Sequence, residues 1–148
     1  MPRIERSAEI TWEGNTARGE GTISAGTGAF TGLPYSLPSR IAKVGETTSP
    51  EELLAAAHGG CLTMSFATEL SRAGTPPTRL TTSCLVVMDE VAGEGHQIVA
   101  SQVRIRADVE GADADALEAA LALADSGCPF STLLRKAGVE VDVAFVVR

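Results

Sequence analysis

Alternating apolar and polar residues predict that several segments of this chain are β-strands. In the clearest case, Val103, Ile105 and Ala107 alternate with charged residues, which is typical of a sheet with one face in water. The alternation is looser near the N-terminus, where Gly14-Asn15 is expected to supply the turn of a hairpin. The predicted strands are residues 4–13, 16–24, 79–91, 97–110 and 139–148.

Helical periodicity is strongest over residues 50–73. Ser49 is a favourable N-cap, Pro50 suits the first helical position, and Glu52 completes a capping box with Ser49. Small or apolar residues cover nearly the whole circumference of this helix, which predicts that it is buried. Its expected apolar stripe contains Leu54, Ala57, Cys61, Met64 and Thr68.

The order of the remaining elements indicates the fold class. Two shorter helices are predicted over residues 113–124 and 129–137, and residues 34–42 are expected to be a short extended segment that ends near Arg40. Because strands and helices stand in separate blocks, the pattern favours an α+β fold. A chain of 148 residues is long enough to bury its own core, so we expect one domain over residues 1–148.

Composition and charge exclude several function classes. The net charge is −7 and the isoelectric point is near 4.8, which argues against binding to nucleic acids or anionic membranes. No stretch approaches the ~18 apolar residues of a membrane-spanning helix. The N-terminal residues lack the apolar region of a signal peptide, so we expect a cytoplasmic protein. In a reducing compartment, a disulfide is more often transient and catalytic than structural.

The three cysteines stand in different contexts. Cys128 precedes Pro129 and is therefore predicted at a helix N-cap, where the helix dipole favours a thiolate. Cys61 lies inside the long helix. It could be a reactive thiol or, as the alternative, an inert residue of the core. The preceding Gly59-Gly60 costs helix stability, about 1 kcal/mol per glycine, which indicates open space or close backbone approach beside Cys61. Cys84 is predicted to be a core or sheet-face residue without a redox role.

Two other chemistries could use these residues. A metal site would need paired ligands at short spacing, and His58 and Cys61 are the only close pair, with His96 in a polar turn. A cysteine hydrolase would need a base beside Cys61, and His58 is one helical turn away. The absent third member of a triad favours a packed or interfacial role for His58.

Two cysteine motifs together resemble the osmotically inducible protein C family, which also includes the organic hydroperoxide resistance proteins. They are Ser-Pro-Glu-Glu-Leu-Leu-Ala-Ala-Ala-His-Gly-Gly-Cys, ending at Cys61, and Gly-Cys-Pro-Phe-Ser, containing Cys128. The N-terminal part resembles the osmotically inducible branch, through Thr11-Trp12-Glu13-Gly14-Asn15, Arg18-Gly19, Gly21-Thr22-Ile23-Ser24, Pro34-Tyr35 and Arg40. The resemblance covers essentially the whole chain. It implies an OsmC-like fold, with antiparallel sheets around a long buried central helix in an intertwined homodimer.

The resemblance also implies an activity and a set of site residues. The implied activity is a thiol-dependent peroxidase that reduces organic hydroperoxides without metal, haem or flavin. Cys61 matches the peroxidatic cysteine, Cys128 the resolving cysteine and Glu51 the family's glutamate. Arg40 matches the active-site arginine best, and Arg18 is the other candidate. An external dithiol, possibly of the dihydrolipoyl type, would then reduce the disulfide.

Helix geometry makes this site difficult to assemble from a single chain. Glu51 lies about 15 Å along the helix axis from Cys61 and is turned about 80° away around it. An arginine such as Arg40 that touched both residues of the same chain would be overstretched. In a two-fold dimer, one chain could supply Glu51 or Arg40 beside the partner's Cys61.

Further alternatives stay open at the sequence level. A redox sensor or binding protein could use the same disulfide as a switch, and a structural protein could carry three inert thiols. An apolar pocket near Phe66, Phe130 and Leu133 would suit a bulky peroxide. The sequence encodes neither the physiological peroxide nor the reductant.

Overall fold

A computed structural model describes residues 2–146. The chain divides into two compact units, the first ending at Pro50 and the second beginning at Glu51. The expectation of one domain over residues 1–148 stays a prediction. Within the described residues, no helix has the length and apolar character needed to cross a membrane.

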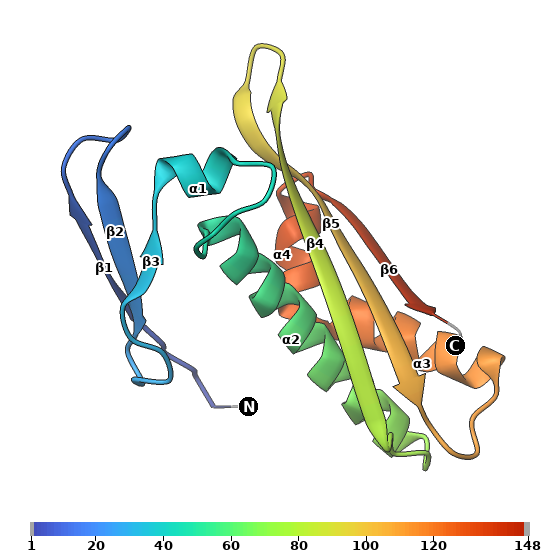
Figure 1. The fold of residues 1–148 in the computed structure, drawn as a ribbon. Coiled ribbons are helices and arrows are strands. Elements are labelled where there is room, and N and C mark those ends of the chain that lie inside the picture. The colour runs from blue at the N-terminus through green and yellow to red at the C-terminus, as the bar shows by residue number, and fades with distance from the viewer. Residues whose placement is uncertain (1, 147–148) are drawn as a thin grey trace. The chain divides into compact units, whose positions relative to one another are not determined.

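The first unit is a small antiparallel sheet followed by a short helix (Figure 1). Its elements are β1 (Ala8–Glu13), β2 (Glu20–Ala25), β3 (Leu33–Tyr35) and α1 (Leu37–Ile41). The predicted hairpin is confirmed, but Glu13 pairs with Glu20, so residues 14–19 form a longer connection than the expected two-residue turn. Every residue of β1 is exposed, and Ile23 is the one described large apolar side chain of this unit that is buried.

The expected extended segment over residues 34–42 is wrong in its second half. Ser36 caps α1, since its Oγ accepts a hydrogen bond from the Ser39 amide at 3.3 Å. A proline in the first turn of α1 fits the helix because that turn leaves its amides unpaired. Arg40 therefore lies in the last turn of α1 and not at the end of a strand.

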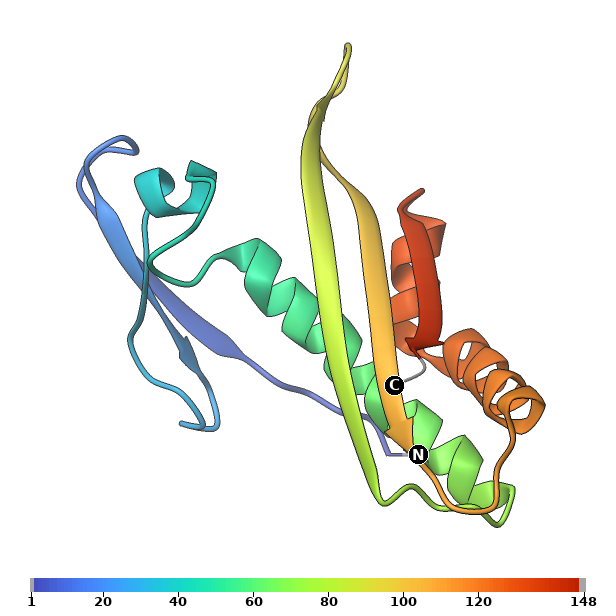
Figure 2. The same ribbon diagram turned by 45° about the vertical axis from the view of Figure 1, so that its right-hand side comes forward.

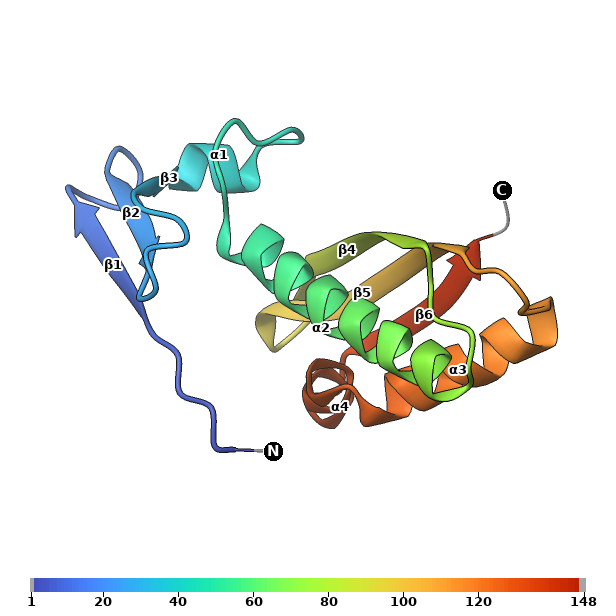
Figure 3. The same cartoon turned by 90° about the horizontal axis from the view of Figure 1, so that it is seen from below.

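The second unit is a three-stranded sheet with three helices on one face (Figures 1 and 3). Its elements are α2 (Pro50–Arg72), β4 (Arg79–Val91), β5 (Gly95–Asp108), α3 (Ala114–Gly127), α4 (Pro129–Lys136) and β6 (Glu140–Val146). These confirm the predicted helices and strands of this region to within a few residues. The last two residues of the predicted final strand lie outside the described residues.

The strand order is β4-β5-β6, and one pairing differs from the expectation of antiparallel sheets. β4 and β5 are antiparallel, whereas β5 and β6 are parallel. Parallel neighbours need a long crossover, and α3 and α4 supply it between β5 and β6 (Figure 2). This crossover places the start of α4, and with it Cys128, beneath the sheet.

The buried face of α2 differs from the predicted stripe. His58, Gly59, Leu62, Phe66 and Leu70 face the sheet and the other helices, whereas Met64 is 72% exposed. The buried set follows the same helical spacing as the predicted stripe, but on a neighbouring face. In the single chain, α2 is thus buried on one side only, and its central position in an assembly stays a prediction.

The packing of α2 against β4 explains why a glycine stands at position 59, although it lowers the stability of the helix. A Cβ atom at this position would lie 3.2 Å from the Cβ of Cys84 on β4, which is tighter than an ordinary van der Waals contact. Gly59 therefore allows α2 to approach β4 closely, as expected, while a Cβ at Gly60 would meet open space. The core beside this contact consists of Leu62, Phe66, Leu70, Val103, Ile105, Ala120, Leu121, Ala124 and Cys128.

Candidate active site

Cys61 and Cys128 lie next to each other in the second unit. Cys61 is on α2 and is partly buried, and Cys128 is a fully buried residue at the N-cap of α4, as the sequence predicted. The two thiols are close enough for Cys128 to raise the pKa of the Cys61 thiol. Both cysteines are free thiols, so the structure brings the two predicted redox partners near each other without a disulfide.

The surroundings of Cys61 do not by themselves favour a thiolate. Burial is the main cause that raises the pKa of the Cys61 thiol, and the neighbouring Cys128 raises it further. The backbone N–H of Phe130 and the Ser65 hydroxyl act in the opposite direction. Pro129 has no N–H, so the Phe130 amide is the first donor that the N-terminus of α4 offers. The N-terminus of α4, which was expected to favour a thiolate at Cys128, thus also lowers the pKa of Cys61.

The active-site arginine that the family resemblance implies is not among the groups that shift the pKa of Cys61. Among the described residues, none of the groups that shift the Cys61 pKa is a cation. Arg40 on α1 and Arg18 between β1 and β2 both belong to the first unit, and Glu51 stands at the start of the second. The roles of these three residues stay predictions.

His58 forms a buried polar bridge that sequence reasoning did not foresee. The ring is 0% exposed, with Nδ1 2.6 Å from Ser101 Oγ on β5 and Nε2 2.8 Å from Ser131 Oγ on α4. Ser101 Oγ also lies 3.5 Å from the Cys84 sulfur. A neutral ring donates through one nitrogen and accepts through the other, so both serine hydroxyls can be satisfied. His58 is therefore a packed histidine, the role that the sequence favoured over a catalytic base. Both of its ring nitrogens have hydrogen-bond partners.

An ion pair between α3 and α4 lies near His58 and acts on its ring. The two terminal guanidinium nitrogens of Arg135 on α4 donate to the two carboxylate oxygens of Asp125 on α3, at 3.0 and 2.6 Å. The hydrogen bond to Asp125 raises the pKa of Arg135, and Cys128 raises it as well. The charge of Arg135 thus reaches the neighbourhood of Cys128.

His58 gives the folding stability a specific pH dependence. Burial lowers its pKa below the usual value of about 6.5, with Asp125 opposing and Arg135 adding to this effect. The unfolded chain therefore takes up the proton first, so this contribution is complete above about pH 6.5 and is lost as the pH falls further. Urea unfolding at about pH 7.5 and about pH 5.5 should show the loss, at most about 1.4 kcal/mol per pH unit. If the free energy of unfolding of His58→Gln falls with pH as steeply as that of the wild type, His58 is not the source of the pH dependence.

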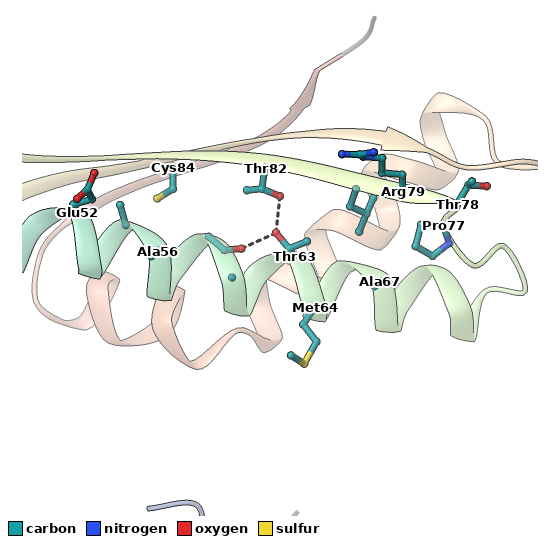
Figure 4. A pocket seen from close by; sticks show the side chains of 14 residues that line it. Glu52, Ala56, Thr63, Met64, Ala67, Pro77, Thr78, Arg79, Thr82 and Cys84 are labelled. Carbon is teal, nitrogen blue, oxygen red and sulfur yellow. Dashed lines mark hydrogen bonds between the residues drawn. The ribbon is translucent and has the colours of Figure 1, made fainter. Parts of the chain in front are cut away.

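Cys84 faces a groove between α2 and β4 (Figure 4). The groove has a volume of about 800 Å³ and is lined mainly by small and apolar side chains of α2, including Ala56, Gly60 and Met64. The Thr63 hydroxyl closes its floor through hydrogen bonds to Thr82 and to the Gly59 carbonyl. Cys61 does not belong to this lining.

The pocket expected near Phe66, Phe130 and Leu133 stays a prediction. Phe66 is 0% exposed in the core, while Leu133 is 59% exposed on α4. Phe130 is partly buried and packs against the core. A substrate could reach Phe130 and Leu133 directly, but Phe66 only after a rearrangement. No group of three metal-ligating side chains comes together within residues 2–146.

Comparison with known proteins gives consistent matches over nearly the whole chain. Peroxiredoxin OsmC of Escherichia coli (strain K12) is 35% identical over 140 residues, covering 94% of this chain and 95% of the relative. The crystal structure of an organic hydroperoxide resistance protein OsmC from Legionella pneumophila matches with a TM-score of 0.74 at 20% identity, covering 98% of this chain and 100% of that one.

The organic hydroperoxide resistance protein OhrB of Bacillus subtilis matches with a TM-score of 0.72 at 19% identity, covering 95% of this chain and 98% of that one. The mixed α+β fold is thus the fold of these structures. A sequence model of the family described as OsmC-like protein matches residues 43–144. With this match and the identity to the Escherichia coli protein, the chain belongs to the OsmC-like protein family.

Proposed function

We propose that this protein is a thiol-dependent peroxidase that reduces organic hydroperoxides to alcohols. The observation that carries the proposal is the proximity of the Cys61 thiol on α2 to the Cys128 thiol at the N-cap of α4. Support for a peroxide substrate comes from the relatives, one named a peroxiredoxin and others named organic hydroperoxide resistance proteins. A cytoplasmic location fits a cycle that depends on reduced thiols.

The first step is attack of the Cys61 thiolate on the distal oxygen of the hydroperoxide. A sulfur–oxygen bond forms and the oxygen–oxygen bond breaks, so that Cys61 becomes a sulfenic acid and the alkoxide leaves as the alcohol after protonation. The sulfur is oxidised by two electrons and the peroxide is reduced by two. The Phe130 amide and the Ser65 hydroxyl stabilise the thiolate that starts this step.

The second step is attack of Cys128 on the oxidised sulfur of Cys61. A sulfur–sulfur bond forms, the sulfur–oxygen bond breaks, and hydroxide leaves as water with one proton. An external dithiol then reduces this disulfide by exchange, returns a proton to each cysteine and is itself oxidised to a disulfide. The buried position of Cys128 shields the resolving thiol from reactions with other partners.

Arg40 activates Cys61 in this proposal, and Glu51 holds its guanidinium. A guanidinium stays charged and can donate two hydrogen bonds, so it offsets the burial that raises the Cys61 pKa. Arg40→Gln should therefore move the midpoint of Cys61 alkylation by iodoacetamide to higher pH by about 1–3 units. Arg18→Gln is the matched control, and a shift in that variant alone would assign the role to Arg18.

We propose that two chains associate to complete the site. The first unit leaves every residue of β1 exposed, and the second leaves Met64 and the α2 groove uncovered. A second copy that covers these apolar surfaces would bury them. Sedimentation should therefore show a dimer, and Met64→Glu should weaken it while Leu123→Glu on α3, also exposed, should not. A fully active monomer at nanomolar concentration would contradict the dimeric site.

A coupled turnover assay separates the enzyme from the alternative of a redox sensor. With excess dithiol, an enzyme consumes many molecules of cumene hydroperoxide per chain, whereas a sensor consumes only the equivalent that forms its disulfide. Peroxide consumption that stops after one equivalent despite excess dithiol would favour the sensor.

A further inference from the structure

We propose that His58 is a positioning residue that holds Cys128 within reach of oxidised Cys61 through its hydrogen bond to Ser131. The inference rests on the proposed peroxidase cycle, and it concerns the second step, in which the disulfide forms. Neither His58 nor Ser131 touches the peroxide in this role. They act through the relative placement of the two helices that carry the cysteines.

The position of this hydrogen bond in the fold supports the role. His58 precedes Cys61 by three residues on α2, and Ser131 follows Cys128 by three residues on α4. Three residues correspond to about 4.5 Å of helix rise, roughly one turn. The bond of 2.8 Å from Nε2 to Oγ therefore joins the two helices about one turn away from each thiol. Both side chains are 0% exposed, so water does not compete for the bond.

The first turn of α4 depends on such an external contact. α4 has eight residues, too few for a helix to be stable alone. Cys128 occupies its N-cap without a side-chain capping bond, so this turn lacks the usual local anchor. The Asp125–Arg135 ion pair holds the opposite end of α4. His58 is thus the polar anchor at the end where the resolving thiol lies.

Disulfide geometry makes this placement matter. The Cβ atoms of a disulfide lie only about 3.5–4.5 Å apart, and a displacement of about 1 Å can cost on the order of a hundredfold in rate. The Phe130 amide, which acts on the Cys61 sulfur, belongs to the same turn of α4 as Ser131. A shift of this turn would therefore change both the position of Cys128 and the polar surroundings of Cys61.

The surroundings of His58 provide a matched control. Its ring binds Ser101 on β5 through the other nitrogen. Ser101 is equally buried, and its hydrogen-bond partners are His58 on α2 and Cys84 on β4, not a residue of α4. The charged groups that act on the ring are Asp125 from α3 and Arg135 from α4, while Cys84 from β4 reaches Ser101. Ser101→Ala and Ser131→Ala each remove one buried hydroxyl from the same histidine, but only the second cuts the link to α4.

The experiment follows oxidation of the full-length protein by one equivalent of cumene hydroperoxide. A dimedone-type probe and mass spectrometry measure the sulfenic acid at Cys61, and non-reducing peptide mapping measures the disulfide. In Ser131→Ala, sulfenic acid should still form, but disulfide formation should slow by about tenfold to a hundredfold relative to Ser101→Ala. With excess peroxide, Ser131→Ala should also accumulate more sulfinic acid, because its sulfenic acid lives longer.

A second pair of variants tests the same link from the histidine side. The amide of a glutamine reaches roughly the position of Nε2, which faces Ser131, and the amide of an asparagine roughly that of Nδ1, which faces Ser101. His58→Gln should therefore retain rapid disulfide formation, and His58→Asn should lose it. If Ser131→Ala does not fold, the comparison of His58→Gln with His58→Asn tests the positioning role instead.

Two outcomes distinguish the failure of this inference from failure of the proposed function. If the wild-type protein forms neither sulfenic acid nor disulfide, the peroxidase proposal itself fails. If the wild type forms both, and Ser131→Ala forms the disulfide as fast as Ser101→Ala, only the positioning role is overturned. Equal rates in His58→Gln and His58→Asn would overturn it in the same way.

Discussion

Replacing Cys61 with serine is expected to abolish dithiol-dependent reduction of cumene hydroperoxide, a loss of about three orders of magnitude or more. Serine has nearly the same size but does not ionise near neutral pH, so the nucleophile of the first step is lost. The replaced side chain is partly buried at the edge of the core, and the substitution should leave the fold intact. Initial rates of peroxide loss, with circular dichroism as a check of folding, measure the effect.

The other two cysteines serve as controls for this prediction. Cys128→Ser should reduce about one equivalent of peroxide and then stop as a sulfenic acid, because resolution is lost. Cys84→Ser should keep nearly full activity, since the Cys84 sulfur lies 3.5 Å from Ser101 Oγ and lines the groove, to which Cys61 does not belong. A large loss in Cys84→Ser, or normal turnover in Cys61→Ser, would contradict the assignment of the peroxidatic thiol.

Replacing Phe66 with alanine is expected to lower the free energy of unfolding by about 3–5 kcal/mol. Phe66 is 0% exposed and is the largest fully buried side chain of the described residues. It packs α2 against the sheet together with Leu62 and Leu70. Alanine would leave a cavity in the layer that holds Cys61 beside Cys128. Urea unfolding at neutral pH measures the loss.

Thr68 on the same helix is the matched control, because it is exposed and its hydroxyl bonds only to the Met64 carbonyl within α2. Thr68→Ala should change the free energy of unfolding by no more than about 0.5 kcal/mol. A loss in Phe66→Ala no larger than that of Thr68→Ala would mean that the helix does not depend on this core contact.

Local sequence signals predicted most elements of the fold. The capping residues of α3 and α4 were readable, since Asp113 accepts from the Ala116 amide and Pro129 follows Cys128. The parallel pairing of β6 was not, because strand order depends on contacts far apart in the chain. The predicted apolar stripe of α2 lies on the face next to the one that is buried. The pattern could not distinguish the two faces, because nearly every side of α2 is small or apolar.

The candidate site was predictable in part. The two cysteine motifs indicated that Cys61 and Cys128 belong together, but only the crossover through α3 brings α4 beneath the sheet beside α2. The serine partners of His58 come from β5 and α4, separated from it by 43 and 73 residues, so no local pattern could reveal them. Arg40 was expected at the end of a short extended segment, although Ser36 and the proline that follows it suit the start of a helix.

The environment of Cys61 connects the chemistry with the proposed assembly. In the described structure, burial and Cys128 raise the pKa of the thiol, and the two hydrogen-bond donors beside it oppose this only in part. A peroxidase at neutral pH needs the thiolate, and a cation beside Cys61 would favour it. The proposed dimer with Arg40 as that cation satisfies this need, and the alkylation and sedimentation experiments test its two parts independently.

A free-thiol titration of the native protein, before and after one equivalent of cumene hydroperoxide, tests the central claim most directly. The chain has three cysteines, so the account predicts a fall from three thiols to one, reversed by a dithiol. Peptide mapping should locate the new disulfide between Cys61 and Cys128. If three thiols remain after the peroxide has been added, the two motifs are structural in this protein and the peroxidase assignment is contradicted.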